Sequence, residues 1–264
     1  MDVETDAGRP AVSRCGNSLV FTVAVWYNYI LGRIKQMIGI IGAMEVEIAG
    51  LMKRIQEPKG VTAGRITVIS GMLNGVNVSV CRCGIGKVNA AAAATLMIER
   101  FPAIELIINL GVAGGIKPGI RQGDFVVAGA AIQHDYDLTP DGLTRGQVAG
   151  YESREFACCK VAANKMCAVL ANLGYRYEKG VIASGDQFIE SKEKACALYR
   201  EFVAYACDME TAAVAHVCDL FGKRFLGIRS MSDNADGGAV EDFYSFVEKA
   251  AERSINAVCA FLEG

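Results

Sequence analysis

Short apolar runs alternate with amphipathic stretches from residue 37 to the end of the chain. The apolar runs have the length and composition of strands, and they cover residues 37–42, 65–72, 76–82, 104–110, 124–132, 181–184 and 224–228. Apolar residues at helical spacing predict helices over residues 45–56, 87–100, 154–173, 190–200, 209–221 and 241–262. Because strands alternate with helices, the pattern predicts an α/β fold.

The predicted sheet is mixed. Asn74-Gly75 joins two strand-like runs, and this dipeptide is typical of a tight hairpin between antiparallel strands. No internal repeat, Pro-rich linker or charge block follows residue 37, so we expect one domain over residues 37–264. The longest predicted loop covers residues 135–150, and long loops in compact domains are often functional.

The first 36 residues differ in character from the rest. Residues 18–31 are apolar, but the run is shorter than the ~20 residues that cross a bilayer and contains a Tyr-Asn-Tyr interruption. Asp2, Glu4 and Asp6 oppose the positive start of a signal peptide. We therefore interpret residues 1–36 as a disordered extension or a start-site artefact preceding Met37, with a targeting or anchoring segment as the alternative.

Composition favours a small-molecule ligand. The formal charge of −2 gives no basic surface for nucleic acid or an anionic membrane. The chain is 52% hydrophobic and can form a core without disulfides, so we interpret most of its ten cysteines as reduced thiols. Two histidines and the absence of a paired CxxC motif argue against a structural metal.

Acidic residues gather where predicted strands and helices meet. Glu45 and Glu47 follow the first strand, Asp208 and Glu210 open a helical pattern, and Asp233 follows the last strand. Strand ends are where α/β folds place ligand sites. From local sequence alone, the first two pairs equally fit favourable charge and capping at helix N-termini.

Other motifs are ambiguous when taken singly. Glycine clusters at residues 84–86 and 111–115 fit a ligand cradle or plain tight turns, since neither completes a phosphate-binding motif. His134-Asp135-x-Asp137 fits a hydrogen-bonded turn better than a metal site, and His216 fits a packed residue. Phe188 fits either core packing or a stacking surface for a flat ligand.

Six ordered motifs together resemble one family, the 5′-methylthioadenosine/S-adenosylhomocysteine nucleosidases of the nucleoside phosphorylase and hydrolase superfamily. The motifs are residues 40–47, 84–88, 109–115, 183–188, 208–210 and 230–233. The resemblance covers residues 37–264 and implies a single three-layer α/β/α domain with a mixed, partly closed central sheet. It also implies a cytoplasmic homodimer that binds a small nucleoside, needs no cofactor or metal, and has no nucleic-acid or membrane partner.

The implied reaction is hydrolysis of the N-glycosidic bond of methylthioadenosine and S-adenosylhomocysteine, which releases adenine and the 5-thioribose product in methionine salvage. By motif position, Asp233 resembles the acid that protonates N7 of adenine and Glu47 the base that activates water. Such a pair stabilises the charges that develop as the bond breaks. The resemblance further implies that substrate is bound by Gly114, Ile189, Met209, Glu210, Phe188, Ala113, Ser232, Met44, Ile85 and Arg229, with Glu210 on the ribose hydroxyls and Phe188 stacked on adenine.

Three positions depart from the family pattern. Val112 replaces a serine that many relatives have, and Asp141 and Leu143 stand where a neighbouring subunit often contributes aromatic residues. These departures leave the preferred 5′ substituent open. A futalosine-type hydrolase, a purine nucleoside phosphorylase and a nucleoside binder without turnover are the alternatives; Glu47 would repel phosphate at the sugar face, which favours hydrolysis.

Overall fold

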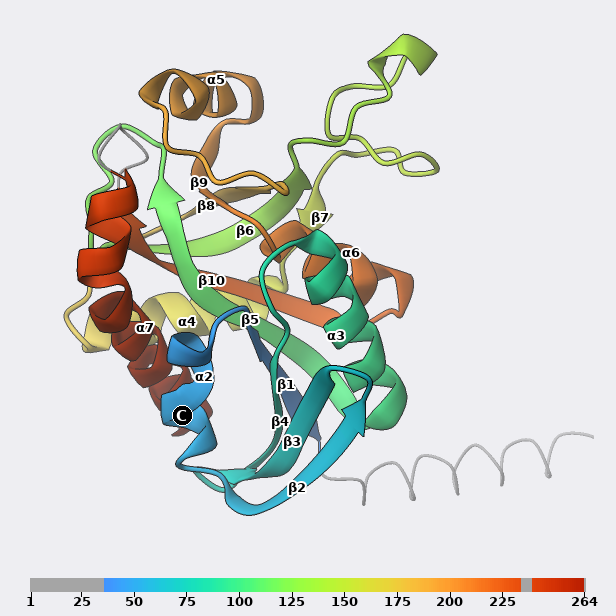
Figure 1. Ribbon diagram of the computed structural model, residues 1–264, viewed down its shortest axis with the longest axis vertical. Helices are drawn as coiled ribbons and strands as arrows, with labels where there is room; N and C mark the ends of the chain where they lie inside the picture. The colour runs from blue at the N-terminus through green and yellow to red at the C-terminus, as the bar shows by residue number, and fades with distance from the viewer. Residues whose placement is uncertain (1–35, 234–238, 264) are drawn as a thin grey trace, which may run out of the picture. The chain divides into compact units, whose positions relative to one another are not determined.

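The protein is seen in a computed structural model that describes residues 36–233 and 239–263 (Figure 1). The side chains of residues 233 and 239–245 also lie outside the described part. The interpretation of residues 1–36 as an extension therefore falls almost wholly outside the described residues. None of the described helices combines the length and apolar character that a bilayer crossing requires.

The strands in the described residues form one mixed sheet. They are β1 (Met37–Gly42), β2 (Gln56–Ala63), β3 (Ile66–Leu73), β4 (Val76–Arg82), β5 (Ile104–Gly115), β6 (Phe125–Gln133), β7 (Phe156–Ala157), β8 (Tyr177–Ser184), β9 (Ala204–Asp208) and β10 (Arg224–Asp233). Their order is β10-β6-β8-β9-β5-β1-β4-β3-β2, with β7 on β6. The pairings include both parallel and antiparallel strands, as expected.

The sheet closes on itself around β5. This strand pairs with β10 along most of one edge, while its other edge pairs with β1 as far as Asn109 and with β9 at Gly114 and Gly115. Since β10 also continues through β6 and β8 to β9, these strands and β5 form a closed ring. The remaining strands extend from β5 as an open sheet. The expected partly closed sheet is confirmed.

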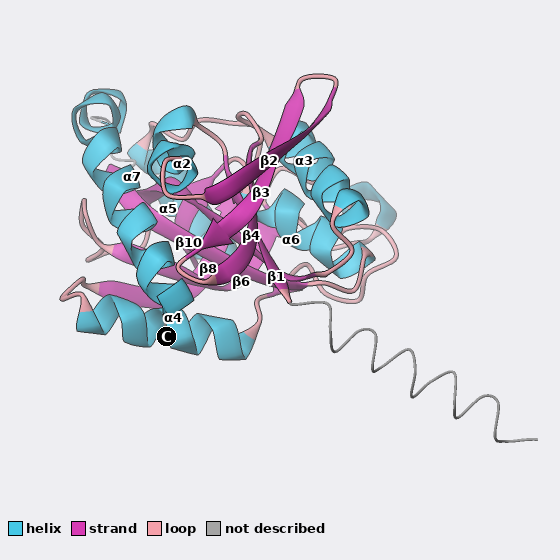
Figure 2. Ribbon diagram, turned by 90° about the horizontal axis from the view of Figure 1, so that it is seen from below, coloured by secondary structure: helices cyan, strands magenta, loops and turns pink. Residues whose placement is uncertain are grey.

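Helices cover both faces of the sheet (Figures 1 and 2). They are α2 (Glu45–Met52), α3 (Lys87–Arg100), α4 (Lys160–Asn172), α5 (Lys192–Phe202), α6 (Thr211–Leu220) and α7 (Ala239–Glu263), with a short 3-10 turn, η1 (Thr139–Asp141). α2 and α4 pack against α7, which crosses β5 and β10, whereas α3 packs against α6 on the other side. α3 comes close to β1 because Gly39 has no side chain: a Cβ there would lie 2.6 Å from Sδ of Met97.

Several boundaries differ from the sequence prediction. α2 ends at Met52, and residue 56 begins β2, a polar, mostly exposed strand that has no apolar alternation to reveal it. The pattern also does not predict β7 and β9. α4 begins at Lys160 rather than 154, and α6 at Thr211 rather than 209. The Asn74-Gly75 hairpin is confirmed, with φ of 49° and 77° at its two residues.

Candidate active site

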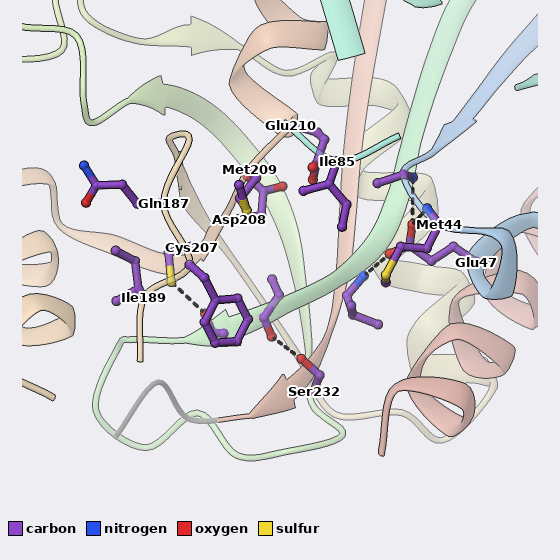
Figure 3. A pocket seen from close by; sticks show the side chains of 15 residues that line it. Met44, Glu47, Ile85, Gln187, Ile189, Cys207, Asp208, Met209, Glu210 and Ser232 are labelled. Carbon is purple, nitrogen blue, oxygen red and sulfur yellow. Dashed lines mark hydrogen bonds between the residues drawn. The ribbon is translucent and has the colours of Figure 1, made fainter. Parts of the chain in front are cut away.

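A pocket opens where the carboxyl ends of β1, β4, β5, β8, β9 and β10 meet, the expected edge for a ligand site in an α/β fold (Figure 3). Counted together with its open mouth, the pocket has about 610 Å³ of empty space. Its lining residues are Ala43, Met44, Glu47, Ile85, Val112, Ala113, Gly114, Gln187, Phe188, Ile189, Cys207, Asp208, Met209, Glu210 and Ser232.

Glu47 is a buried acid of the pocket whose carboxylate is held by three backbone N–H groups. Only 2% of the residue is exposed; its Oε2 accepts hydrogen bonds from the backbone N–H groups of Ala43 (2.7 Å) and Met44 (2.9 Å), and its Oε1 accepts one from Val112 (3.0 Å). The approach to β5 requires Gly111, where a Cβ would lie 2.6 Å from Oε1 of Glu47. The carboxylate is thereby fixed between β1 and β5.

The pKa of Glu47 is raised above its ordinary value. Burial is the main cause, and the charge of Arg229 and the three backbone N–H groups oppose it only in part. A carboxylate with a raised pKa is a stronger base than a solvated one. The site therefore contains a fixed acid–base group that faces an apolar pocket.

Glu210 is a second buried carboxylate of the pocket, supplied by the segment between β9 and α6. Its Oε1 accepts a hydrogen bond from the backbone N–H of Gly86 (2.8 Å), at the start of α3. Burial and the charge of Asp208 raise the pKa of Glu210 to about 7, against the opposing effects of Arg229 and the Gly86 N–H. Figure 3 shows Glu210 beside Ile85.

Asp208 and Arg229 form a buried ion pair, with 2% of each side chain exposed. Nε of Arg229 donates to Oδ2 of Asp208 at 2.7 Å, and its other nitrogens donate to Asn109. Oδ1 of Asp208 accepts from Ser184 Oγ at 2.5 Å, and Thr211 donates to the same carboxylate. Removing one member of such a pair typically costs ~3–5 kcal/mol of folding stability, so this network holds β9, β10 and α6 together.

Across the pocket from Met44 and Glu47, Figure 3 places Ile189, Cys207 and Gln187. Sγ of Cys207 lies 3.7 Å from the carbonyl oxygen of Gly114, and Oγ of Ser232 donates to the carbonyl of Ala113 at 3.4 Å. Phe188 is 46% exposed at the mouth of the pocket.

Most of the residues predicted from sequence lie together in this pocket. Those that line it are Met44, Glu47, Ile85, Ala113, Gly114, Phe188, Ile189, Met209, Glu210 and Ser232. Arg229 is not among the lining residues; its guanidinium donates hydrogen bonds to Asp208, which does line the pocket, and to Asn109. Asp233 ends β10 opposite Gly114, but its side chain is outside the described residues.

Sequence reasoning misses Ala43, Gln187, Cys207 and the part that Asp208 plays. Asp208 fits a helix cap by sequence, and it does accept the N–H of Thr211, but its main partner is Arg229. The sequence does carry one signal of this role: Asp208 and Arg229 are opposite charges, each beside an apolar run, and charges that become buried need partners. Gln187 and Cys207 carry no signal beyond their place beside recognised motifs.

The remaining motif residues, His216 and Asp137, contact other protein side chains and backbone and do not line the pocket. His216 stacks on Phe156, with ring centroids 4.5 Å apart, so it is a packed residue as predicted. Oδ1 of Asp137 accepts from N and Oγ1 of Thr139, which is the predicted hydrogen-bonded turn. Within the described part of the chain no group of His, Cys, Asp and Glu side chains is arranged to hold a metal ion.

Known proteins resemble the chain over the whole of this fold. Residues 37–263 match the family described as the phosphorylase superfamily. The chain is 40% identical to the 5′-methylthioadenosine/S-adenosylhomocysteine nucleosidase of Shewanella halifaxensis, over 86% of this chain and 98% of the relative. The nucleosidase of Neisseria meningitidis, solved with methylthio-immucillin-A, is similar with a TM-score of 0.83 and 34% identity, over 86% of this chain and 99% of that one. A futalosine hydrolase mutant of Helicobacter pylori is similar with a TM-score of 0.82 and 32% identity, over 86% and 99% of the two chains.

Proposed function

Because the chain belongs to the phosphorylase superfamily and, within it, to the 5′-methylthioadenosine/S-adenosylhomocysteine nucleosidases, we propose that it hydrolyses the N-glycosidic bond of these two nucleosides. The products are adenine and the corresponding 5-thioribose, as methionine salvage requires. The observation that carries this proposal is the buried carboxylate of Glu47, fixed by three backbone N–H groups at an apolar pocket.

In the proposed mechanism Glu47 is the base and Asp233 the acid. Glu47 takes a proton from a water molecule whose oxygen adds to C1′ of the ribose, while Asp233 donates a proton to N7 of adenine. The C1′–N9 bond breaks, and its electron pair leaves with the purine. The raised pKa of Glu47 supports its role as base, and the place of residue 233 at the end of β10 supports that of the acid.

The same proposal assigns the remaining pocket residues to the two halves of the nucleoside. Glu210 and the Met209 backbone hold the ribose hydroxyls, and the Glu210 carboxylate also stabilises positive charge on the sugar. Phe188 stacks on adenine, Ile189 offers its backbone to the purine edge, and Ala113, Gly114, Ser232, Met44 and Ile85 complete the walls. Arg229 acts from behind by holding Asp208.

Hydrolysis is favoured over phosphorolysis by charge. The residues that line the described pocket include no Lys or Arg, and they include Glu47, Asp208 and Glu210. The nearby guanidinium of Arg229 is already paired with Asp208. A phosphate anion at the sugar face would meet carboxylates, with no cation among the lining residues to offset them.

We further propose a homodimer in the cytoplasm, with residues 37–264 as the nucleosidase domain. Ile85 and Phe188, which line the pocket, are exposed by 55% and 46%, and large exposed apolar side chains at a pocket favour contact with another protein surface. Nine described cysteines are free thiols, which fits a reducing compartment.

The test is to incubate purified protein with methylthioadenosine, S-adenosylhomocysteine and futalosine, with and without phosphate, and to identify the sugar product. We expect adenine from the first two substrates at a rate that phosphate does not change. A ribose-1-phosphate product that requires phosphate would contradict hydrolysis. Faster turnover of futalosine would instead favour the related hydrolase, which shares this fold.

A further inference from the structure

Asp135 connects two chain segments on different sides of the pocket, although it does not line the pocket itself. It begins the loop after β6. Its Oδ1 accepts a hydrogen bond from Nζ of Lys87 at 2.6 Å, and its Oδ2 accepts one from the backbone N–H of Asp186 at 2.9 Å. Lys87 opens α3 and follows Ile85 of the pocket wall, whereas Asp186 precedes Phe188 and Ile189.

The two segments are also joined directly. Oδ1 of Asp186 accepts from the backbone N–H of Lys87 at 2.8 Å, and the neighbouring N–H of Gly86 donates to Glu210 at 2.8 Å. The consecutive N–H groups of Gly86 and Lys87 thus bind the carboxylates of Glu210 and Asp186. Both carboxylates lie at the N-terminus of α3, where the helix dipole favours negative charge. A shift of either segment would therefore move residues that line the pocket.

The contact between Asp135 and Lys87 is largely shielded from water. Their side chains are 17% and 18% exposed, and Lys87 Nζ also donates to Gln133 Oε1 at 3.2 Å. Burial alone would raise the pKa of Asp135, but the bonds from Lys87 and from the Asp186 N–H hold it below its ordinary value, so the carboxylate is charged near neutral pH. A shielded, charge-assisted bond is stronger than an exposed ion pair.

Close backbone packing keeps the Asp186 segment against this anchor. A Cβ at Gly185 would lie 2.4 Å from Nε2 of His134 and 3.0 Å from Cγ of Asp135. Glycine is thus required for the segment to pass this near to the end of β6. The hydrogen bond from Asp186 to Asp135 depends on that approach.

We infer that Asp135 is a positioning residue: it ties the start of α3 to the segment of residues 185–189 and so sets the geometry of the purine-binding wall. The inference rests on the proposed function for the identity of the ligand. Within the motif His134-Asp135-x-Asp137, Asp135 is thereby explained by pocket geometry, whereas Asp137 belongs to the turn with Thr139. Asp135 acts through Lys87 and Asp186 and does not touch the substrate.

The experiment compares the full chain with the Asp135→Ala, Asp135→Asn and Asp137→Asn variants. We measure kcat and KM for methylthioadenosine, and the Kd for adenine by titration. Asp135→Ala should raise KM and the adenine Kd roughly tenfold or more, as expected for loss of a charge-assisted bond, with a smaller fall in kcat. Asp135→Asn should raise KM and the adenine Kd by less than Asp135→Ala does. Its amide oxygen can still accept from one of the two donors, Lys87 Nζ and the Asp186 N–H, but its NH₂ group would face the other. Asp137→Asn, two residues away on the surface, should match the wild type.

A second variant, Lys87→Met, tests whether the effect of Asp135 on KM arises from its bond to Lys87 and not from a general loss of stability. Lys87→Met should also raise KM, and combining it with Asp135→Ala should add little, because the shared bond is already absent. If Asp135→Ala does not fold, Asp135→Asn and Lys87→Met are judged by the same criteria. Unchanged KM and adenine Kd in folded variants, additive effects, or a fall in kcat alone would each overturn the inference. If the wild type releases no adenine, the proposed function fails, while the adenine titration still decides the role of Asp135.

Discussion

At the scale of single residues, Glu47 and its neighbour Glu45 make a matched pair of acids. Glu47 is buried and bound by three N–H groups, whereas the side chain of Glu45 is 66% exposed and pairs with Arg82 on the surface. We expect Glu47→Gln to lower kcat by ~10²–10⁴-fold, the usual worth of a general base. Asp233→Asn should have a similar effect. Glu45→Gln should leave kcat within about twofold, since surface ion pairs contribute little.

The Glu47→Gln substitution also has a predictable effect on folding. Both oxygens of Glu47 accept backbone N–H groups, so either orientation of the substituted amide sets its NH₂ group against a donor. We expect a loss of about 1–3 kcal/mol in the free energy of unfolding, with the fold retained. Circular dichroism and denaturant titration check this. Near-normal kcat in folded Glu47→Gln protein would show that another group activates the water.

If Glu210 holds the ribose hydroxyls as proposed, we expect substrate binding to depend on pH. Its pKa is raised to about 7, and the charged form is the better acceptor for ribose hydroxyls. We expect kcat/KM for methylthioadenosine to fall as the pH drops below about 7, and Glu210→Gln to lose both activity and this limb of the profile. The profile is measured across this pKa, from acidic to mildly alkaline buffer. Persistence of the same limb in Glu210→Gln would assign it to a different group.

The linked effect on stability has the opposite sign to that of an acid whose pKa is lowered by folding. Since the pKa of Glu210 is higher in the folded than in the unfolded state, the folded state binds more protons between pH 4.5 and about 7. The contribution of this group to the free energy of unfolding therefore decreases as the pH rises through that window. To isolate this contribution, the free energy of unfolding is measured for the wild type and Glu210→Gln at pH 4.5 and at about pH 7, and the two changes with pH are compared.

At the scale of elements, apolar periodicity predicts those that have one buried face. α3 and the strands β1 and β4 have the predicted bounds. β2 could not be predicted, because it is a polar edge strand whose formation depends on pairing with β3. β9 is short, and its identity as a strand depends on neighbours β8 and β5, of which β5 is distant in sequence. Local pattern carries no information about such pairings.

The elements also explain why the candidate site can be found in sequence only in part. Motifs recognised by resemblance bring most pocket residues together, since each lies at or just after the end of a strand and these strand ends meet at the same edge. The sequence signals that Asp208 and Arg229 need partners, but not that they pair with each other, because the two residues belong to different strands and meet only once the ring of strands closes. Asp135 likewise shows its partners only when the start of α3 and the end of β8 are placed beside it.

At the scale of the whole molecule, the described contacts place every part of the site beyond residue 36. β1 begins at Met37 and pairs with β5, the strand that supplies the Val112 N–H to Glu47. The family match also begins at residue 37. Every residue of the pocket lining and of the Asp135 contacts lies after that position.

We therefore expect a chain that starts at Met37 to fold and to hydrolyse methylthioadenosine with kcat and KM within about twofold of the full chain, because terminal segments are usually dispensable unless they are tied into the core. Both proteins are compared by steady-state kinetics, thermal unfolding and size-exclusion chromatography with light scattering, which also tests the proposed dimer. Loss of solubility or activity in the shorter chain would mean that residues 1–36 contribute to the folded domain. Recovery of only the full chain with membranes would show instead that this segment is an anchor.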